Sequence, residues 1–314
     1  MQPKISILLP THNKADLLKF ALHSVLAQTY QNFEVLVVGD GCTDHTSRIV
    51  EEFNDPRLIW FDLPKAPNFG YANRNIALRQ ARGDLIAFMA HDDLWMSDHL
   101  ECLVPIFDNN RIEIAYSQPL WVIPKGMLVP GYFNLEEPST LEFFMEKGNK
   151  IPAACFLHRK ECFEKYGYWN EQITIAGDYD QWKRIIKGGN FHNYAYLNYP
   201  TCLHFKAAWH TKRYDLNNDF PSWVHLFESG QMPQTLRIPT ATDGSEQEAV
   251  WNFISANPQA WNDTMRSAVL QVTGLLAYKG LIDAPKSLDL RRLNKSIIQK
   301  ILERLAVLPG TKTK

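Results

Sequence analysis

Two adjacent carboxylates, Asp92 and Asp93, come two residues after the segment 84–89, whose pattern is typical of a buried strand. Adjacent acids at a strand end can hold a divalent cation of the Mg²⁺ or Mn²⁺ type, with phosphate oxygens and water completing the coordination shell. The same pair also suits a plain loop or helix start before Leu94. Taken alone, the pair therefore leaves both interpretations open, and the loop is the commoner outcome.

Two further acids occupy comparable positions. Asp40 lies between two glycines after an apolar run, and Asp178 begins an amphipathic pattern over residues 178–187. Each has a plain interpretation as a turn or capping residue and a functional one as a site carboxylate. The sequence favours structural or surface roles over metal binding for three histidines: His91, His204 and His210.

The elements that must position these acids alternate between strand and helix patterns over residues 4–116. Near-continuous apolar runs separated by helical periodicity predict an α/β fold with a mostly parallel sheet covered on both faces. Ligands of such sheets bind beyond the carboxyl ends of the strands, where the polar residues fall here. The predicted strands are 5–9, 33–38, 58–61, 84–89 and 112–116, and the predicted helices are 17–26, 43–53, 73–81 and 97–107.

The second half is less regular. Residues 117–152 are rich in proline and glycine, which predicts loops, a hairpin and a short helix near 141–147. The elements predicted after it are a strand at 153–158, helices at 160–166 and 178–187, and strands at 191–197 and 202–205. From about residue 215 onward, helical segments joined by proline-containing links are expected.

Composition excludes several classes of protein. The 314 residues are 45% hydrophobic with a formal net charge of -1, which argues against disorder and against an electrostatically driven nucleic-acid binder. No apolar run approaches the ~20 residues that span a bilayer. No signal-peptide pattern follows Met1, so a cytoplasmic location is expected. The five cysteines are widely spread, as expected of isolated reduced thiols.

The joint pattern resembles glycosyltransferase family 2, whose catalytic domain has the GT-A (Rossmann-like) fold. Together the matching segments cover about residues 3–210 and occur in the family's order. Residues 5–13 resemble the family's first strand with its P-T-x-N turn, 24–34 its S-x-x-x-Q-T-Y signature, and 37–44 the loop that reads the nucleotide base. Residues 74–77 resemble its R-N-x-A helix, 92–93 its acidic metal motif, and 177–184 the element that carries the catalytic base.

The resemblance implies an inverting transferase that moves a sugar from a nucleoside-diphosphate sugar to an acceptor hydroxyl with the help of Mn²⁺ or Mg²⁺. It implies a metal ligand at Asp93 and a general base at Asp178. The donor-binding residues that it implies are Pro10, Thr11, Asn13, Asp40, Arg74 and Asp92. It also implies a catalytic domain over 1–214, with a nucleotide-sugar half at 1–116 and an acceptor half at 117–214, followed by a helical extension at 215–314.

Three residues depart from the family pattern. Gly39 replaces the first of two base-reading acids, Ala90 replaces an additional acid of the metal motif, and Gly177 replaces a glutamate. The first two changes give some weight to an alternative, a catalytically silent member that binds a nucleotide sugar or carbohydrate. Retention of Asp40, Asp93 and Asp178 favours the transferase. A nicotinamide-type G-x-G-x-x-G turn is absent after the first strand.

The expected acceptor is a glycan, a lipid-linked or a small-molecule hydroxyl. Residues 290–308 predict a final helix with an apolar stripe bordered by basic residues. Such a helix can lie on a membrane surface, which would place the protein peripherally at the inner face of the cell membrane. The favoured alternative is packing on the catalytic domain or on a second subunit in a homodimer.

Overall fold

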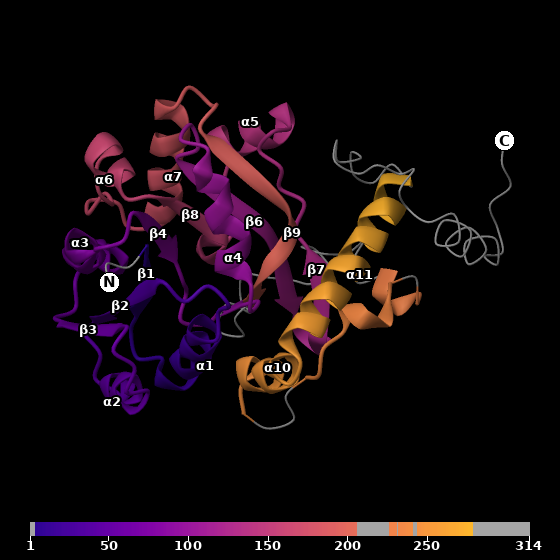
Figure 1. Cartoon of the computed structure of the whole chain (residues 1–314), viewed down its shortest axis with the longest axis horizontal. Coiled ribbons are helices and arrows are strands. Elements are labelled where there is room, and N and C mark those ends of the chain that lie inside the picture. The colour runs from indigo at the N-terminus through magenta and orange to yellow at the C-terminus, as the bar shows by residue number, and fades with distance from the viewer. Residues whose placement is uncertain (1–3, 206–225, 231, 241–243, 279–314) are drawn as a thin grey trace, which may run out of the picture.

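The protein is described from a computed structural model that covers residues 4–205, 226–230, 232–240 and 244–278. Within these residues the chain forms one mixed nine-stranded sheet. Figure 1 shows helices flanking this sheet. The strand order is β3-β2-β1-β4-β8-β6-β9-β5, and β7 pairs with β6 outside this path. The predicted α/β class with a central sheet is confirmed.

The first half supplies the parallel part of the sheet. Its strands are mostly apolar because helices cover both faces, and the register places Ile7 opposite Val35 and Ile5 opposite Leu85. Since β3, β2, β1 and β4 all run parallel, their carboxyl ends meet at one edge. The elements are β1 (Ile5–Thr11), α1 (Ala15–Leu26), β2 (Phe33–Asp40), α2 (Thr46–Glu52), β3 (Leu58–Leu63), α3 (Tyr71–Gln80) and β4 (Leu85–Phe88).

The second half extends the sheet with both strand directions. The chain adds β5 (Leu94–Trp95), α4 (His99–Leu103), β6 (Ile114–Ile123), β7 (Met127–Pro130), α5 (Pro138–Glu146), β8 (Phe156–Arg159), α6 (Glu161–Tyr166), α7 (Gly177–Gly188) and β9 (Tyr194–Phe205). β8 is antiparallel to both β4 and β6, whereas β9 is parallel to β6.

Two predictions for this half are wrong in detail. Residues 117–123 continue β6 and form the hairpin with β7, because this strand is buried on both sides despite Pro119. The two strands predicted at 191–197 and 202–205 are one strand, β9, whose pairing with β6 shifts register near Ser117 and Gln118. The shift absorbs the residues that read as a break in the sequence.

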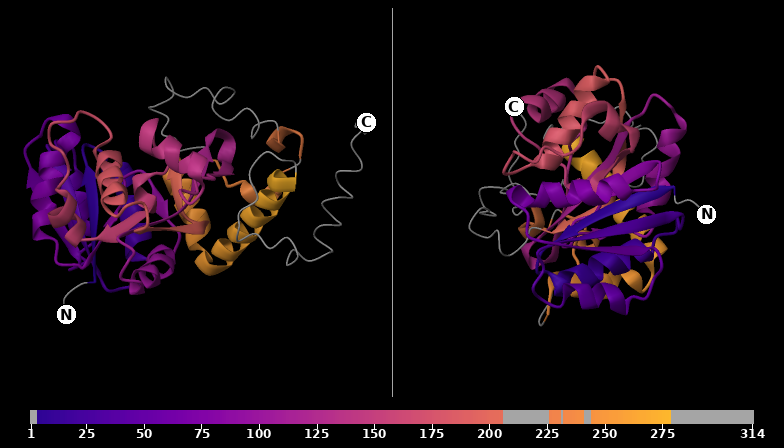
Figure 2. Two further views of the ribbon diagram at one scale, coloured as in Figure 1. Left: turned by 90° about the horizontal axis from the view of Figure 1, so that it is seen from above. Right: turned by 90° about the vertical axis from the view of Figure 1, so that its left-hand side faces the viewer.

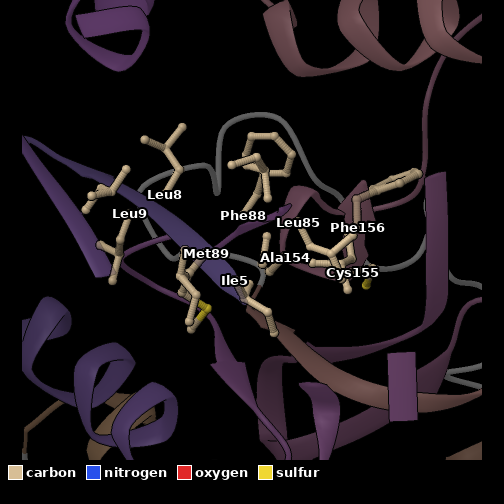
Figure 3. Close-up of a cluster of buried hydrophobic side chains, with 14 of the residues drawn as sticks. Ile5, Leu8, Leu9, Leu85, Phe88, Met89, Ala154, Cys155 and Phe156 are labelled. Carbon is tan, nitrogen blue, oxygen red and sulfur yellow. The ribbon is translucent and has the colours of Figure 1, made fainter. Parts of the chain in front are cut away.

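The main hydrophobic core lies between the parallel strands and the helices around them. Figure 3 shows side chains of β1, β4 and the start of β8 packed together, including Ile5, Leu85 and Phe156. Ile5, Leu85 and Phe156 are fully buried. Burial of this kind contributes roughly 25 cal/mol per Å² of apolar surface, so this core fixes the strands whose ends carry the predicted site.

Two polar residues of the 24–34 segment tie this core together. Glu34 is buried and accepts hydrogen bonds from the Ser6 hydroxyl and from the backbone N–H and Nε of Arg82. Gln28 is also buried; its amide donates to the Met96 carbonyl and accepts from the Leu100 N–H. Their hydrogen bonds are thus structural ties between distant segments.

The C-terminal helices pack against the far part of the sheet. α10 (Glu246–Ser255) and α11 (Pro258–Tyr278) share a second hydrophobic cluster with β5, β6, β7 and β9, and Figure 2 shows them at one end of the sheet. Arg266 of α11 pairs with both oxygens of Asp98, at 2.7 and 2.8 Å. No helix in the described ranges is both long and apolar enough to cross a bilayer. The predicted boundary at 214/215 and the predicted helix at 290–308 lie outside the described residues.

Candidate active site

Asp40 ends β2 and is held by three donors. Its Oδ1 accepts from the Ala66 N–H at 2.8 Å and from Asn73 Nδ2 at 2.7 Å, and its Oδ2 accepts from Lys65 Nζ at 2.6 Å. The carboxylate is nearly buried, with 10% of the side chain exposed. Gly70, at φ 72°, lies against it, since a Cβ there would fall 2.6 Å from Oδ2. Asp40 is therefore a rigid, oriented acceptor at the strand end.

Gly39, the first departure from the family pattern, has a steric cause. A Cβ at this position would lie 2.3 Å from the indole ring of Trp60 on β3. Trp60 thus fills the space that a side chain at 39 would need, and a glycine is required for close packing of the two strands. One acid remains at this strand end where the family pattern has two.

The turn after β1 contains three predicted donor-binding residues. Thr11 is almost fully buried, and its Oγ1 has no hydrogen-bond partner within the described part of the chain. The Asn13 side chain accepts from the Thr43 N–H at 2.7 Å, so it joins this turn to the one after β2. Pro10 lies in register with Val38, and its carbonyl oxygen is 3.3 Å from His91 Nδ1. The orphaned Thr11 hydroxyl is the one best placed to take a ligand partner.

Asp93 follows β4 and faces His204 of β9. The two carboxylate oxygens lie 2.9 and 3.0 Å from His204 Nδ1, and Oδ1 also accepts from the Phe205 N–H at 3.2 Å. Burial raises the pKa of the Asp93 carboxyl, and the neighbouring imidazole opposes that rise. Asp92 is half-buried, and its carbonyl oxygen accepts from Gln247 of α10 at 3.1 Å.

His204 is the residue that the sequence interpretation missed. The sequence favours a structural or surface role for it, and no local motif surrounds it. The pairing of β5 with β9, which sets Leu94 opposite Leu203, brings His204 beside Asp93 from 111 residues away. His210 lies outside the described residues. Within those described, no cluster of three or more histidine, cysteine or acidic side chains could hold a metal by itself.

Arg74 of α3 lies against two aromatic rings that also contact each other. Its guanidinium carbon is 5.0 Å from the centre of the Tyr71 ring and 4.9 Å from that of Trp169, and its Nε is buried without a hydrogen-bond partner. Burial lowers the pKa of this guanidinium, while Asp178, Tyr71 and Asp40 act against that effect. The stacking orients a cation whose remaining N–H groups are available to a ligand.

The neighbouring Asn75 holds this arrangement in place. Its Oδ1 accepts from the Trp169 N–H at 3.1 Å, and its Nδ2 donates to the Trp169 carbonyl at 2.9 Å. The structure therefore gives a role to both Arg74 and Asn75. Arg74 presents the cation, and Asn75 positions the indole on which the cation stacks.

Asp178 lies in the first turn of α7. The preceding Gly177 donates its N–H to the Tyr71 hydroxyl at 2.9 Å, and a Cβ on Gly177 would fall 2.6 Å from the Tyr71 ring. This contact explains the glycine in place of the family's glutamate. Trp182, Ile185 and Ile186 of the same helix are fully buried, as predicted, so the carboxylate projects from a fixed element.

Two opposing effects act on the protonation of Asp178, because the backbone N–H groups at the start of α7 favour the ionised carboxylate and burial disfavours it. Burial raises the pKa of this carboxyl, and the Tyr179 N–H and the charge of Arg74 only partly offset that rise. A raised pKa suits a carboxylate that must accept a proton near neutral pH. Asp180 instead pairs with Arg184 at 3.0 Å, on another side of the helix.

The carboxyl edge of the parallel strands thus carries the Asp40 carboxylate, the Asp93–His204 pair, and Arg74, whose charge acts on Asp178. With the mixed sheet beneath them, these groups define a glycosyltransferase of the GT-A class. Residues 6–167, more than half of the chain, match the model of glycosyl transferase family 2, and the chain belongs to this family.

Two relatives illustrate the match in sequence. An uncharacterized glycosyltransferase of Rickettsia typhi is 26% identical over 192 residues, which cover 59% of this chain and 59% of that protein. The Escherichia coli UDP-Glc:alpha-D-GlcNAc-diphosphoundecaprenol beta-1,3-glucosyltransferase WfgD is 37% identical over 112 residues, covering 36% of this chain and 44% of WfgD. The chain therefore spans less than two thirds of the length of these relatives.

Solved structures support the fold. Staphylococcus aureus TarS 1–349 superposes with a TM-score of 0.52 at 22% identity, covering 64% of this chain and 60% of that one. The same protein in complex with UDP-GlcNAc gives a TM-score of 0.52, covering 65% and 59%. The likeness establishes a shared GT-A architecture.

Proposed function

We propose that the protein transfers a sugar from a nucleoside-diphosphate sugar to an acceptor hydroxyl with inversion at the anomeric carbon. The observation that carries the proposal is the convergence of Asp40, Asp93 with His204, and Arg74 with Asp178 around one edge of the parallel strands. Each group serves a different requirement of the reaction: binding of the base, neutralisation of the diphosphate, and removal of a proton.

The donor half of the site is proposed as follows. Asp40 accepts a hydrogen bond from a ring N–H of the base, and Asp92 contacts the ribose or a metal-bound water. Arg74 offers its remaining N–H groups to the diphosphate. Pro10, Thr11 and Asn13 form the turn on which the nucleotide lies, with the unpartnered Thr11 hydroxyl as a direct contact and Asn13 as the tie that shapes the turn.

The residues at the end of β4 fit a divalent cation. A buried carboxylate beside an imidazole is an oxygen-and-nitrogen donor set suited to Mn²⁺, and a carboxylate with phosphate oxygens suits Mg²⁺ as well. We propose Asp93 as the principal ligand, with His204 at its side, and diphosphate oxygens for the remaining positions. A bound cation would supply Lewis-acid neutralisation of the leaving diphosphate.

Asp178 is proposed as the general base. It lies on a rigid helix next to Arg74, so it can accept the acceptor's hydroxyl proton while the oxygen attacks the anomeric carbon from the face opposite the diphosphate. Direct displacement of this kind inverts the anomeric centre. The acceptor proton moves to the Asp178 carboxylate, and the nucleoside diphosphate leaves with the bonding electron pair.

The proposed acceptor is a glycan, lipid-linked or small-molecule hydroxyl bound mainly by the 117–214 half, with 215–314 as the C-terminal extension. The membrane contact and the homodimer remain predictions, because residues 290–308 lie outside the described residues. A cytoplasmic location, peripheral at the inner face of the cell membrane, is proposed together with that contact.

A panel of nucleotide sugars tests the proposal. Calorimetry with and without Mn²⁺ should identify a donor that binds more tightly with the metal. Donor turnover should then rise when an acceptor is added, and NMR of the product should show an inverted anomeric configuration. Metal-dependent donor binding without hydrolysis or transfer, across a broad acceptor set, would favour the catalytically silent alternative.

A further inference from the structure

Trp121 contacts His204, the histidine that faces Asp93. The centres of the indole and imidazole rings are 4.7 Å apart, and the ring planes are nearly perpendicular, at 89°. Aromatic rings prefer such an edge-to-face arrangement, because the positive edge of one ring meets the negative face of the other. Trp121 is half-buried on β6 and packs against the second hydrophobic cluster. The His204 imidazole therefore has an aromatic partner besides the Asp93 carboxylate.

The register shift between β6 and β9 creates this contact. Before the shift Ser117 pairs with Leu197, and after it Trp121 pairs with His204. If the first register continued, the strand partner of Trp121 would be Thr201 instead. The irregularity thus aims one side chain at another, which is a common effect of bulges beside functional sites.

Trp121 is itself held on a rigid part of the sheet. Its backbone lies between two paired strands, with Val129 of β7 on one side and His204 of β9 on the other. Gly131, directly after β7, donates its N–H to the Pro119 carbonyl at 2.9 Å. A Cβ on Gly131 would lie 3.0 Å from Nε1 of Trp121, so the glycine leaves room for the indole. The indole is therefore a fixed surface against which the imidazole packs.

We propose that Trp121 is a positioning residue for the metal site, which fixes the orientation of the His204 imidazole. The inference rests on the proposed function, since it concerns the cation proposed at Asp93. Both Asp93 oxygens contact His204 Nδ1, but they are also the atoms offered to the cation. The aromatic contact does not compete for those oxygens, so it restrains the imidazole whether or not a cation is bound. An imidazole that is already oriented loses less conformational freedom when it meets a cation, which favours binding.

Binding of Mn²⁺ to the full chain tests the inference without an activity assay. Electron paramagnetic resonance can follow free Mn²⁺ during a titration, first with Mn²⁺ alone and then with UDP present. Trp121→Leu removes the ring and should weaken Mn²⁺ binding about 2- to 10-fold, the range expected for the loss of one aromatic pair. Trp121→Phe keeps an aromatic ring and should recover most of the affinity. Wild-type affinity in Trp121→Leu would overturn the inference.

A double-variant cycle shows whether Trp121 acts through the histidine. His204→Ala should weaken Mn²⁺ binding by itself, and Trp121→Leu should then have no further effect in that background. Additive losses would show that Trp121 acts on the cation by another route and would contradict the inference. An unchanged affinity in His204→Ala would contradict it as well, because the imidazole would then make no contact with the cation.

Trp251→Leu is the matched control. Trp251 of α10 is also half-buried against the second hydrophobic cluster and also contacts a histidine, His23 of α1, with ring centres 5.8 Å apart. Both Trp→Leu variants should be less stable in urea, whereas only Trp121→Leu should lose Mn²⁺ affinity. The same weakening of Mn²⁺ binding in both would indicate a packing effect and contradict the inference. If Trp121→Leu does not fold, Trp121→Met replaces it, because methionine fills irregular space without an aromatic ring.

The wild-type titration separates this inference from the proposed function. Mn²⁺ binding that depends on Asp93 but not on Trp121 would retain the proposed metal site and reject only the positioning role. Failure of the wild-type chain to bind Mn²⁺, with or without UDP, would reject both the metal-assisted function and the inference.

Discussion

Replacement of Asp178 by Asn separates the chemistry of the site from its architecture. Asparagine has nearly the same size as aspartate, and its Oδ1 can still accept the Tyr179 N–H, which lies 2.8 Å from the Asp178 carboxylate. It cannot accept the acceptor's proton. The variant should therefore bind donor as the wild type does and fail to transfer.

The expected loss follows from the role of a general base. Proton transfer by a positioned side chain contributes about 10²- to 10⁴-fold, which corresponds to about 2.7–5.5 kcal/mol of transition-state stabilisation. Donor affinity should change little, because the donor contacts are assigned to other residues. Asp180→Asn is the matched control, since that carboxylate pairs with Arg184 and should retain most of the turnover.

The difference in unfolding free energy between Asp178→Asn and the wild type should depend on pH. Burial raises the pKa of Asp178 in the folded protein, so ionisation is easier in the unfolded chain and the carboxylate costs folding free energy once it is charged. This cost is absent below the ordinary carboxyl pKa, grows as the pH rises through that value, and is complete above the raised pKa. Asparagine never ionises, so the stability of Asp178→Asn relative to wild type should rise with pH. Arg74 and Tyr71, the charged and titratable neighbours named for this carboxyl, do not change charge in that window.

The assays are donor calorimetry, steady-state turnover and urea unfolding at pH 5 and above. Turnover within a few-fold of wild type in Asp178→Asn would refute the assignment. An active Asp178→Asn together with an inactive Asp180→Asn would show that the wrong carboxylate was chosen. A parallel loss of donor binding, turnover and stability would indicate a structural residue.

Three further predictions concern the strand ends. Asp93→Asn should keep the hydrogen bond from the Phe205 N–H and abolish metal-dependent transfer. Asp93→Ala should abolish transfer and also lose about 1–3 kcal/mol of unfolding free energy. Mn²⁺-dependent turnover equal to wild type in either variant would reject Asp93 as the metal ligand. Asp40→Ala should weaken nucleoside-diphosphate binding by roughly 1.5–3 kcal/mol, and calorimetry showing no change would count against base recognition. Gly39→Ala should cost about 1–3 kcal/mol in unfolding free energy because its Cβ meets the Trp60 ring, and Trp60→Val should recover part of that loss; an additive double variant would contradict the steric explanation.

The parallel half of the fold could be predicted because its signals are local. Apolar runs that end in polar turns set β1, β2 and β4, and the acids at those ends follow from the rule that ligands bind at carboxyl edges. The second half of the fold could not be predicted in this way. β9 crosses Pro200 without a break because β6 pairs with it on both sides of a register shift, and no window of sequence contains that partner.

The site residues fall into the same two groups: those with a local sequence signal and those that depend on long-range contacts. Asp40, Asp93 and Asp178 each lie in a recognisable segment, so their positions were predictable. His204 faces Asp93 only because β5 pairs with β9, and Lys65 reaches Asp40 only because Gly41 admits the neighbouring loop. Burial also raises the pKa of Asp178, which the sequence does not predict, since desolvation depends on what packs around a residue and not on its place in a helix.

Two of the three departures from the family pattern, Gly39 and Gly177, argue for a working enzyme. If selection on the site had been lost, a missing acid would leave a void or an unrelated polar residue. Gly39 is instead matched by Trp60, and Gly177 by Tyr71, whose hydroxyl also accepts the Gly177 N–H. Tyr71 in addition stacks on Arg74, the cation whose charge offsets the burial of Asp178. At positions 39 and 177 the lost acid is thus replaced by an aromatic side chain, and the second of these side chains helps to position the proposed base. Substitutions that preserve the geometry of the remaining carboxylates are those expected when transfer is maintained, which weighs against a silent binding protein.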